Sequence, residues 1–415
     1  MKEFTGWNYL LIDVANQYGL DKETFEKRIE WANAHLDELE ALTDQAENKP
    51  LYVKAVMAIR RAQKGLPIGH LVGFDASCSG LQIMSVVTGC HAGAEATGLI
   101  DPNKRADAYM ACTQAMNQIL KETTGGTVQV ARKDAKKALM TSFYGSTAQP
   151  KSIFGEDTPE LAAFYKAAQQ IAPGAWELLH DLLASWQPFT KMHAWQLPDG
   201  FEAKVKVMQK VETRIEVDEL DHATFTYEYY VNEGTEKGLS IAANVVHSID
   251  AYVVRSIHRR CNYNAETVHN AYKLLENTLQ ARKDLGVKPT TPTARIAYYV
   301  DLWERSDIAD VVILPHLNER TVQQLPTQLA EELLAIVKGM LAYKPFEVVT
   351  IHDEFKCHPN HMNHLRRQYV SIMQALASSK ILDMILSGIY GKPVQYQKLS
   401  HNLDQAMANS NYGLC

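Results

Sequence analysis

The sequence has little of what marks a secreted, membrane-bound or strongly basic protein. Its start, MKEFTGWNYL, has no positively charged region followed by an apolar stretch, and no apolar run approaches the ~18 residues of a membrane span. The six cysteines show neither the paired spacing of a zinc site nor the density of a disulfide framework. We therefore expect reduced thiols in a protein that is neither exported nor embedded in a membrane.

An excess of positive charge is also absent. The 415 residues carry a formal net charge of −6, so any surface for nucleic acid must be a local basic face on a mildly acidic protein. With 46% hydrophobic and 22% charged residues, this is an ordinary globular chain. It is long enough for two or three subdomains.

Helical periodicity dominates the first third of the chain. One amphipathic helix is predicted to start at the capping acid Asp21 and to be interrupted by ENKP at 47–50. A short strand and a turn of small residues follow around Asp75. A second amphipathic helix is predicted to start at Asp101-Pro102 and to end at Gly125-Gly126.

The remainder mixes helices with one region of a different period. Residues 158–186 predict helix broken at Pro173, and residues 238–260 predict another helix. Between them, residues 203–233 alternate apolar and polar side chains around an acidic turn, which predicts a long β-hairpin. Residues 262–340 contain helix-like segments and have the character of an insertion. The predicted fold class is α+β, mostly helical.

Two predicted strands end in acids. Asp75 follows Leu-Val-Gly-Phe, and Asp353 follows Val-Val-Thr-Ile-His. If these strands are neighbours in one sheet, the two carboxylates repel each other unless divalent cations lie between them, and oxygen ligands favour Mg²⁺. Two such ions about 3.5–4 Å apart would suit nucleotide polymerisation. A lone acid of this kind is more commonly a turn residue, and Glu354 is either a third ligand or, as we favour, a solvated side chain.

A basic helix is predicted within ARKDAKKALMTSFYG. Arg132, Lys136 and Tyr144 follow at spacings of four and eight, which places them on one helical face. This face could hold a triphosphate and place an aromatic ring beside the reacting nucleotide. The alternative is a solvated basic helix with a tyrosine in the core.

Three ordered motifs resemble motifs A, B and C of the single-subunit RNA polymerases of bacteriophages and mitochondria. They are Asp75-x-Ser77-Cys78-Ser79-Gly80, Arg132-x3-Lys136-x7-Tyr144-Gly145 and His352-Asp353. Smaller matches are Pro198-Asp199-Gly200-Phe201, Asn244-Val245-Val246-His247-Ser248 and Asn411-Tyr412. They span most of the chain in the order of the family.

The resemblance implies a right-hand polymerase palm and fingers with a small antiparallel palm sheet. It implies catalytic roles for Asp75, Asp353, Lys136 and Tyr144, and two Mg²⁺ ions held by Asp75, Asp353 and the carbonyl of Ala76. It implies substrate-binding roles for Arg132, Lys137, His247, Gly80 and Gly145. Tyr144 and His247 would monitor the ribose.

The same resemblance implies a division of the chain. Its parts are an N-terminal helical segment at 1–64, a first palm part at 65–91, fingers at 92–247 and a second palm part at 248–415 that includes the insertion at 262–340. The hairpin at 203–233 is similar in position to the promoter-reading loop of the family. Its acidic tip, Asp218-Glu219-Leu220-Asp221, would repel DNA phosphates.

One position favours ribonucleotides over deoxyribonucleotides. Related DNA polymerases carry a bulky Glu five residues after the first acid, where it excludes a 2′-hydroxyl, and this chain has Gly80. Tyr144 and His247 each offer a polar group that could hydrogen-bond that hydroxyl. The third motif, however, reads His352-Asp353-Glu354, which matches the His-Asp-Glu of DNA polymerases and differs from the pattern of the RNA polymerases.

Full-length members of the family have several hundred residues before the palm, including a promoter-binding domain. Either the chain is a fragment, or a second polypeptide supplies the missing N-terminal region, as in split, heterodimeric phage polymerases, and we favour the second. Trp7, Tyr9, Leu10 and Phe25 could dock that partner or pack on the palm, and the two interpretations are equally favoured.

The leading interpretation is a catalytic subunit for DNA-templated RNA synthesis in the cytoplasm of an infected bacterial host. Its partners would be the DNA template, the RNA product, ribonucleoside triphosphates and, because net acidity predicts weak unaided DNA binding, a recruiting single-stranded DNA-binding protein. The alternatives are a family A-like DNA polymerase or primase-like enzyme, and a catalytically silent DNA-binding scaffold.

Overall fold

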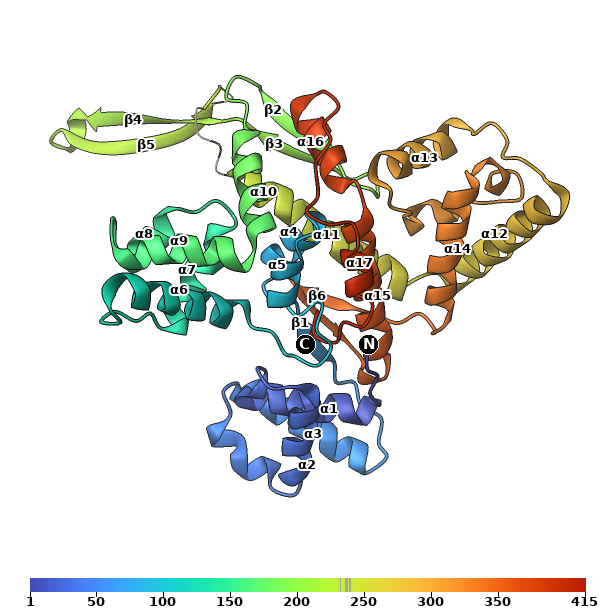
Figure 1. Ribbon diagram of the computed structural model, residues 1–415, viewed down its shortest axis with the longest axis horizontal. Helices are drawn as coiled ribbons and strands as arrows, with labels where there is room; N and C mark the ends of the chain where they lie inside the picture. The colour runs from blue at the N-terminus through green and yellow to red at the C-terminus, as the bar shows by residue number, and fades with distance from the viewer. Residues whose placement is uncertain (232, 236–237, 239) are drawn as a thin grey trace.

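A computed structural model describes residues 1–231, 233–235, 238 and 240–415 (Figure 1). This part of the chain is mostly helical, with one three-stranded and two two-stranded antiparallel sheets. The predicted α+β class is confirmed. The α-helices are α1 (Gly6–Ala15), α2 (Phe25–Ala34), α3 (Lys49–Gln63), α4 (Ser79–Val87), α5 (His91–Ala96), α6 (Ala108–Thr124), α7 (Arg132–Ser142), α8 (Ala148–Phe154), α9 (Pro159–Ile171), α10 (Pro173–Ala184), α11 (Ser240–Cys261), α12 (Ala265–Leu285), α13 (Ala294–Ser306), α14 (Thr327–Leu341), α15 (Met362–Ser378), α16 (Ile381–Tyr390) and α17 (Leu403–Ala406). The strands are β1 (Val72–Asp75), β2 (Met192–Gln196), β3 (Glu202–Lys206), β4 (Gln209–Val217), β5 (Ala223–Val231), β6 (Val349–Ile351) and β7 (Glu354–Cys357).

The three-stranded sheet has the order β1-β7-β6. Residues on β1 and β7 alternate between the core and the opposite face, because successive side chains of a strand point to opposite sides. Phe74 and Phe355 are buried in the main core, whereas Asp75 and Glu354 form a cross-strand pair on the other face. Helices α4, α11 and α15 pack against one another behind this sheet.

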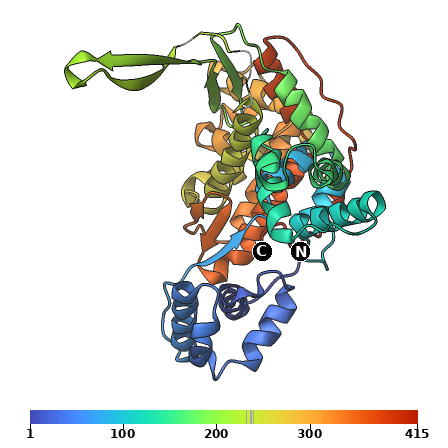
Figure 2. The same cartoon turned by 90° about the vertical axis from the view of Figure 1, so that its left-hand side faces the viewer.

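The N-terminal helices α1, α2 and α3 form a layer below the sheet (Figure 2). Tyr9, Leu10 and Phe25 are almost completely buried, and Trp7 is partly buried. The rings of Tyr9 and Phe25 lie 5.8 and 5.4 Å from the ring of Phe74 on β1. Tyr9, Leu10 and Phe25 therefore pack within the chain, and the alternative that these three form a docking face is wrong, whereas Trp7 remains partly exposed.

Two predicted helix starts are wrong, because a different capping residue ends each preceding loop. Helix α2 begins after Thr24, whose hydroxyl accepts a hydrogen bond from Lys27 N, rather than at Asp21. Helix α6 begins after Asp107 rather than at Asp101, whose carboxylate accepts from Asn103 N in a turn.

The segment ENKP at 47–50 also has a different role from the one predicted. It does not only interrupt a helix: Asn48 caps α3, and Pro50 lies in the first turn of that helix.

Helices α6 to α10 form a second helical group on one side of the sheet (Figure 1). The predicted end of α6 is confirmed, since Gly125 adopts a left-handed conformation with φ of 69° at its C-terminus. The predicted break at Pro173 is also confirmed, because α9 ends at Ile171 and α10 starts at the proline.

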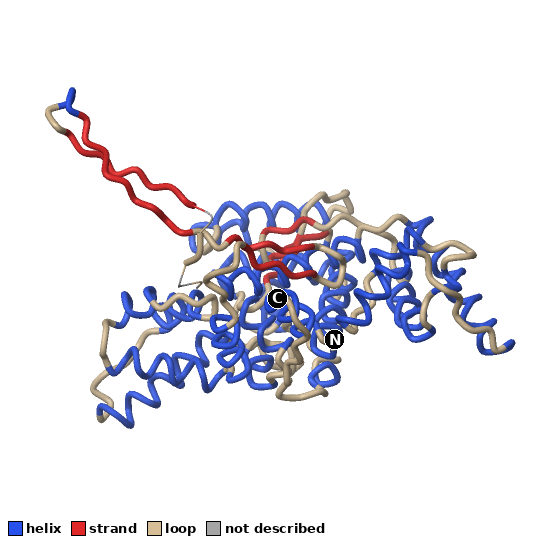
Figure 3. The backbone as a smooth tube through the Cα atoms, turned by 90° about the horizontal axis from the view of Figure 1, so that it is seen from above, coloured by secondary structure: helices blue, strands red, loops and turns tan. Residues whose placement is uncertain are grey.

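The predicted hairpin at 203–233 is two separate structures. Strand β3 pairs with β2, and only β4 and β5 form the long hairpin, which we call the ribbon (residues 209–231). The ribbon projects away from the body of the molecule (Figure 3). Between β3 and β4 lies Val207, whose side chain is fully buried and whose amide donates to the carbonyl of Lys191 at 3.3 Å. The hairpin was predicted to continue to residue 233, but β5 ends at Val231, and residue 232 is outside the described residues.

Residues 263–341 contain a second hydrophobic core, separate from the main one, built from α12, α13, α14 and two short 3₁₀ turns. This unit lies at the opposite side of the sheet from helices α6 to α10 (Figure 1). Arg259 on α11 lies between Asp310 of this unit and Asp199 of the β2–β3 turn, 3.7 and 2.9 Å from their carboxylates.

Across the described ranges, no single helix is long and apolar enough to cross a membrane. The segments Pro359–Ser378 and Ile381–Tyr390, bent by 59° at their junction, meet the length and composition only as a pair. The six cysteines are free thiols.

Candidate active site

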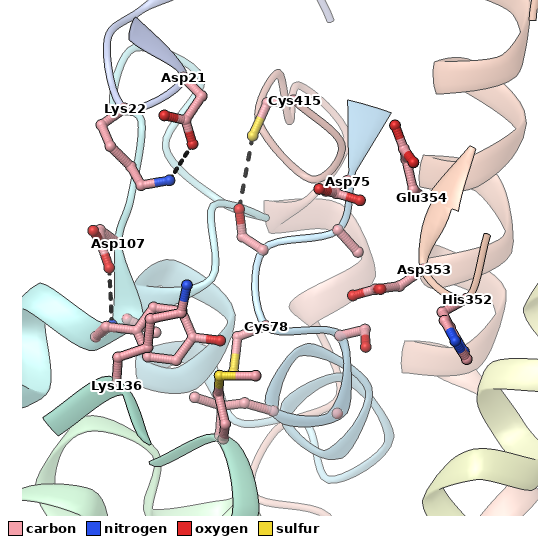
Figure 4. A pocket seen from close by; sticks show the side chains of 18 of the residues that line it. Asp21, Lys22, Asp75, Cys78, Asp107, Lys136, His352, Asp353, Glu354 and Cys415 are labelled. Atoms are coloured by element: carbon pink, nitrogen blue, oxygen red, sulfur yellow. Dashed lines mark hydrogen bonds and ion pairs between the residues drawn. The ribbon is translucent and has the colours of Figure 1, made fainter. Parts of the chain in front are cut away.

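An open cleft of 950 Å³ lies over the end of β1 and the β6–β7 turn. Asp75, Asp353 and Glu354 lie on one side of it, with Lys22, Asp107 and Lys136 across from them (Figure 4). The lining residues come from the N-terminal helices, the sheet, α4, α6, α7 and α11. The cleft thus joins segments from nearly the whole chain.

The two predicted acids are held by strained turns. Asp353 is the second residue of the two-residue turn between β6 and β7, and the preceding His352 has a φ of 55°. Asp75 ends β1 and is followed three residues later by Cys78, which has a φ of 58° at the start of α4. Positive φ at a non-glycine residue costs free energy and is concentrated at functional sites.

Backbone hydrogen bonds link the two turns directly. The amide of Ala76 donates to the carbonyl of Asp353 at 3.1 Å, and the amide of Cys415 donates to the carbonyl of Asp75 at 3.0 Å.

The predicted pairing of the two acid-bearing strands needs one correction. Strand β1 pairs with β7, which follows Asp353, and not with β6, which precedes it.

The acids form an electrostatically strained cluster. Although Asp75 opens into the cleft, the surrounding walls desolvate its carboxylate, and the nearby Glu354 and Asp353 repel its charge. Together these effects raise the pKa of Asp75 to about 6. Burial, followed by repulsion from Asp353, likewise raises the pKa of Asp250 on α11 to about 6.

The expectation that Glu354 is a solvated side chain is wrong, because Glu354 is partly buried and paired. Its carboxylate pairs with Lys356 at 2.9 Å, and three quarters of its side chain is buried. A Cβ at Gly73 would lie 2.3 Å from the Glu354 carboxylate, so the absence of a side chain there gives this carboxylate its place.

The opposite wall is cationic. Arg132 begins α7 and is bound by Asp107, whose Oδ2 accepts from Nε at 2.9 Å and Nη2 at 2.6 Å. Lys136, one turn later, is exposed to the cleft, and no carboxylate pairs with it within the part of the chain that the structure describes. The ring of Tyr109 lies 5.6 Å from the Arg132 guanidinium and 5.4 Å from the Lys136 ammonium.

Tyr144 lies just beyond the end of α7, between α4 and α11. Its ring centroid is 4.9 Å from that of His247, and burial is the main cause that raises its pKa to about 12, so it stays a hydrogen-bond donor at neutral pH. A Cβ at Gly80 would lie 2.3 Å from the Tyr144 hydroxyl. Glycine at position 80 is therefore what allows Tyr144 to occupy this place.

The structure brings together most of the predicted site residues. Those that line the cleft are Asp75, Ala76, Gly80, Arg132, Lys136, Tyr144, His247 and Asp353. Lys137 and Gly145 are not among the lining residues, although each adjoins one that is. Gly145 has a φ of 92°, which suits the turn directly after Tyr144.

Several lining residues were missed by the sequence analysis. They are Lys22, Arg105, Asp107, Tyr109 and Asp250. Asp250 follows His247 by three residues, so the shared face of α11 was a usable signal. For Lys22 and Arg105 no local pattern exists, because loop contacts position them: Arg105 donates to Ser77 Oγ at 2.9 Å and to the carbonyl of Asp21 at 3.3 Å.

Only one group of three metal-ligating side chains within 4.8 Å of one another occurs among the described residues, and it lies elsewhere. It comprises Glu216, Asp218 and His222 at the exposed tip of the ribbon. In the cleft, Asp75 and Asp353 are two carboxylates that line the same open space.

Residues 2–153 match the family model described as DNA-dependent RNA polymerase. The DNA-directed RNA polymerase of Pseudomonas phage phiKMV is 25% identical over 59% of this chain. DNA-directed RNA polymerase 1, mitochondrial, of Arabidopsis thaliana is 29% identical over 34% of it, and the mitochondrial enzyme of Neurospora crassa is 22% identical over 34%. The matches cover 37%, 18% and 12% of those proteins, so the chain spans well under half of their length.

The expected resemblance to DNA-directed RNA polymerases of phages and mitochondria is confirmed. The part that matches the polymerase family contains Asp75, Arg132, Lys136 and Tyr144, and it ends before Asp353. The pairing of β1 with β7 is what brings Asp353 to the polymerase-like segment.

Proposed function

We propose that this chain forms the palm and fingers of a DNA-directed RNA polymerase and catalyses DNA-templated addition of ribonucleotides. The observation that carries the proposal is one cleft in which Asp75 and Asp353 face Arg132, Lys136 and Tyr144. The three-stranded sheet with α4, α11 and α15 would be the palm, and helices α6 to α10 the fingers.

The donor set of the cleft suits Mg²⁺. Asp75 and Asp353 offer carboxylate oxygens, and a bound cation would oppose the desolvation and the repulsion by Glu354 and Asp353 that raise the pKa of Asp75. We propose that these two acids and the carbonyl of Ala76 hold two Mg²⁺ ions. Bound there, the ions would favour ionisation of the attacking 3′-hydroxyl and stabilise the leaving pyrophosphate.

The cationic wall would bind the rest of the nucleotide. Arg132 and Lys136 would hold the triphosphate, since guanidinium and ammonium groups both pair strongly with phosphate oxygens. Tyr144 and His247 would contact the ribose, with Tyr144 as a neutral donor. Gly80 gives the Tyr144 hydroxyl its place, and this donor, rather than open space at position 80, supports selection of ribonucleotides.

The chain spans 37% of the phage relative, which supports a role for further polymerase residues outside it. We propose that a second polypeptide, as in a split phage polymerase, supplies the N-terminal region, and that a protein bound to single-stranded DNA recruits the enzyme. The net charge of −6 supports the need for recruitment. The enzyme would act in the cytoplasm of an infected bacterial host.

The test is extension of an RNA primer on a DNA template by the purified chain with Mg²⁺. Ribo- and deoxyribonucleotides are offered separately, and Asp353→Asn is compared with Asp301→Asn, which removes an exposed acid of α13. We expect ribonucleotide addition that Asp353→Asn reduces at least ~10³-fold, as for loss of a metal-binding group, and that Asp301→Asn leaves unchanged. Preferential deoxynucleotide addition, or addition that Asp353→Asn does not affect, would contradict the proposal.

A further inference from the structure

The cationic wall contains one carboxylate that the proposed function leaves unexplained. Both oxygens of Asp107 are engaged, and by different parts of the chain. Oδ1 accepts from the amides of Tyr109 at 3.0 Å and Met110 at 3.1 Å, which caps α6. Oδ2 accepts from Nε and Nη2 of Arg132. Asp107 therefore joins the N-terminus of one helix to the first side chain of another.

This contact leaves part of the Arg132 guanidinium available. A guanidinium has five N–H donors in a rigid planar fork, and Asp107 occupies the edge formed by Nε and Nη2. The donors on Nη1 and the remaining donor on Nη2 stay unused by Asp107. Because Arg132 lines the cleft, those donors are the ones that a phosphate group could reach.

A second contact restricts Arg132 by packing its guanidinium over an aromatic ring. The ring of Tyr109 lies 5.6 Å from the guanidinium carbon, and it also lies 5.4 Å from the ammonium of Lys136. The start of α6 thus restrains the two cations of α7 that line the cleft: Asp107 binds Arg132, and the ring of Tyr109 lies beside both Arg132 and Lys136. An arginine that is hydrogen-bonded at one edge and packed over a ring has lost much of its rotamer freedom before any ligand arrives.

The geometry points to Asp107 as a positioning residue, which holds Arg132 in the orientation that binds the triphosphate of the incoming nucleotide. This inference rests on the proposed function of the same cleft. The negative charge of Asp107 is partly balanced by the N-terminus of α6, where backbone amides and the helix dipole favour an anion. It therefore repels a nearby triphosphate less than an isolated carboxylate would.

The same short segment also reaches the acidic side of the cleft. Arg105, two residues before Asp107, donates to Ser77 Oγ at 2.9 Å, and Ser77 lies two residues after Asp75. Residues 105–109 are therefore a continuous link between the turn that holds the first acid and the helix that holds the cations. This link connects the two walls of the cleft.

The experiment compares Asp107→Asn, Arg132→Ala and the double variant in the full chain. Asparagine is as good a helix cap as aspartate, so Asp107→Asn removes the charged contact to Arg132 and keeps the start of α6. Binding of ATP, inorganic triphosphate and adenosine is measured by titration, together with KM and kcat for ATP in primer extension. Thermal unfolding checks that each variant is folded.

We expect Asp107→Asn to weaken ATP and triphosphate binding about tenfold, as for loss of one charge-assisted hydrogen bond. KM should rise with little change in kcat, adenosine binding should stay the same, and the double variant should bind ATP no more weakly than Arg132→Ala alone.

Three results would overturn the inference. Tighter ATP binding by Asp107→Asn would mean that Asp107 competes with phosphate for Arg132. Additive losses in the double variant would mean that Asp107 acts elsewhere, and equal loss of adenosine binding would mean a general structural role. A wild-type chain that binds neither ATP nor triphosphate would count against the proposed function itself, and with it this inference.

Discussion

At the scale of single residues, the surroundings of Asp75 disfavour its ionised carboxylate, which is the form that would bind a divalent cation. Its carboxylate is desolvated and faces two other acids, which raises its pKa to about 6 from an ordinary value of 3.8. The folded chain therefore binds a proton at Asp75 more tightly than the unfolded chain does. A divalent cation relieves the same repulsion without protonation.

The direction of this pKa shift determines how the free energy of unfolding depends on pH. With the folded pKa raised, the contribution of Asp75 to stability is fully present below pH 3.8 and is lost as the pH rises through about 6. Asp75→Asn should therefore raise the melting temperature at pH 7.5 without Mg²⁺, by about 1–3 °C. The gain should shrink as the pH falls toward 4. Calorimetric unfolding of both proteins across this range checks it, and a gain that grows on acidification would contradict the assigned electrostatics.

The residues that could be predicted are those whose chemistry is written in a local pattern. Asp75 and Asp353 follow apolar strands, and Arg132 and Lys136 recur at helical spacing, so they could be predicted as candidate site residues before any contact was known. Asp107 and Tyr109 belong to an ordinary amphipathic helix and acquire their role only by touching α7. Such contacts between elements leave no signal in a single sequence.

At the scale of elements, the ribbon shows where periodicity alone misleads. Residues 202–206 and 209–217 both alternate, but they belong to different hairpins, since the first stretch pairs with β2 and the second with β5. The partner of the first stretch is β2, a five-residue strand directly after a helical region. Alternation identifies a strand but does not choose its partner.

The charge of the ribbon allows a prediction about DNA. Residues 209–231 carry two basic and six acidic side chains, so this element repels a polyanion. Replacing 209–231 with a short glycine-rich turn should leave the affinity for duplex DNA unchanged or increase it, and should not weaken it. Fluorescence anisotropy with a labelled duplex at two salt concentrations measures this. A loss of affinity would show that the ribbon contacts DNA despite its charge.

At the scale of the whole molecule, the arrangement depends on pairing between distant segments. The strand that ends in Asp75 pairs with the strand that follows Asp353, close to the other end of the chain. The α+β class and most helices were predictable, because periodicity and capping residues are local. The order β1-β7-β6 was not, since nothing in either strand specifies which of two successive strands becomes its neighbour.

The central claim is that Asp75 and Asp353 act as one unit in a single nucleotidyl transfer. The most direct test is one-nucleotide extension of an RNA primer, with release of pyrophosphate measured in the same reaction, for Asp75→Asn, Asp353→Asn and the double variant. Groups that act together give non-additive losses, so each single variant should lose at least ~10³-fold in rate and the double variant little more. Losses that multiply, or a single variant that retains extension with stoichiometric pyrophosphate, would contradict the account.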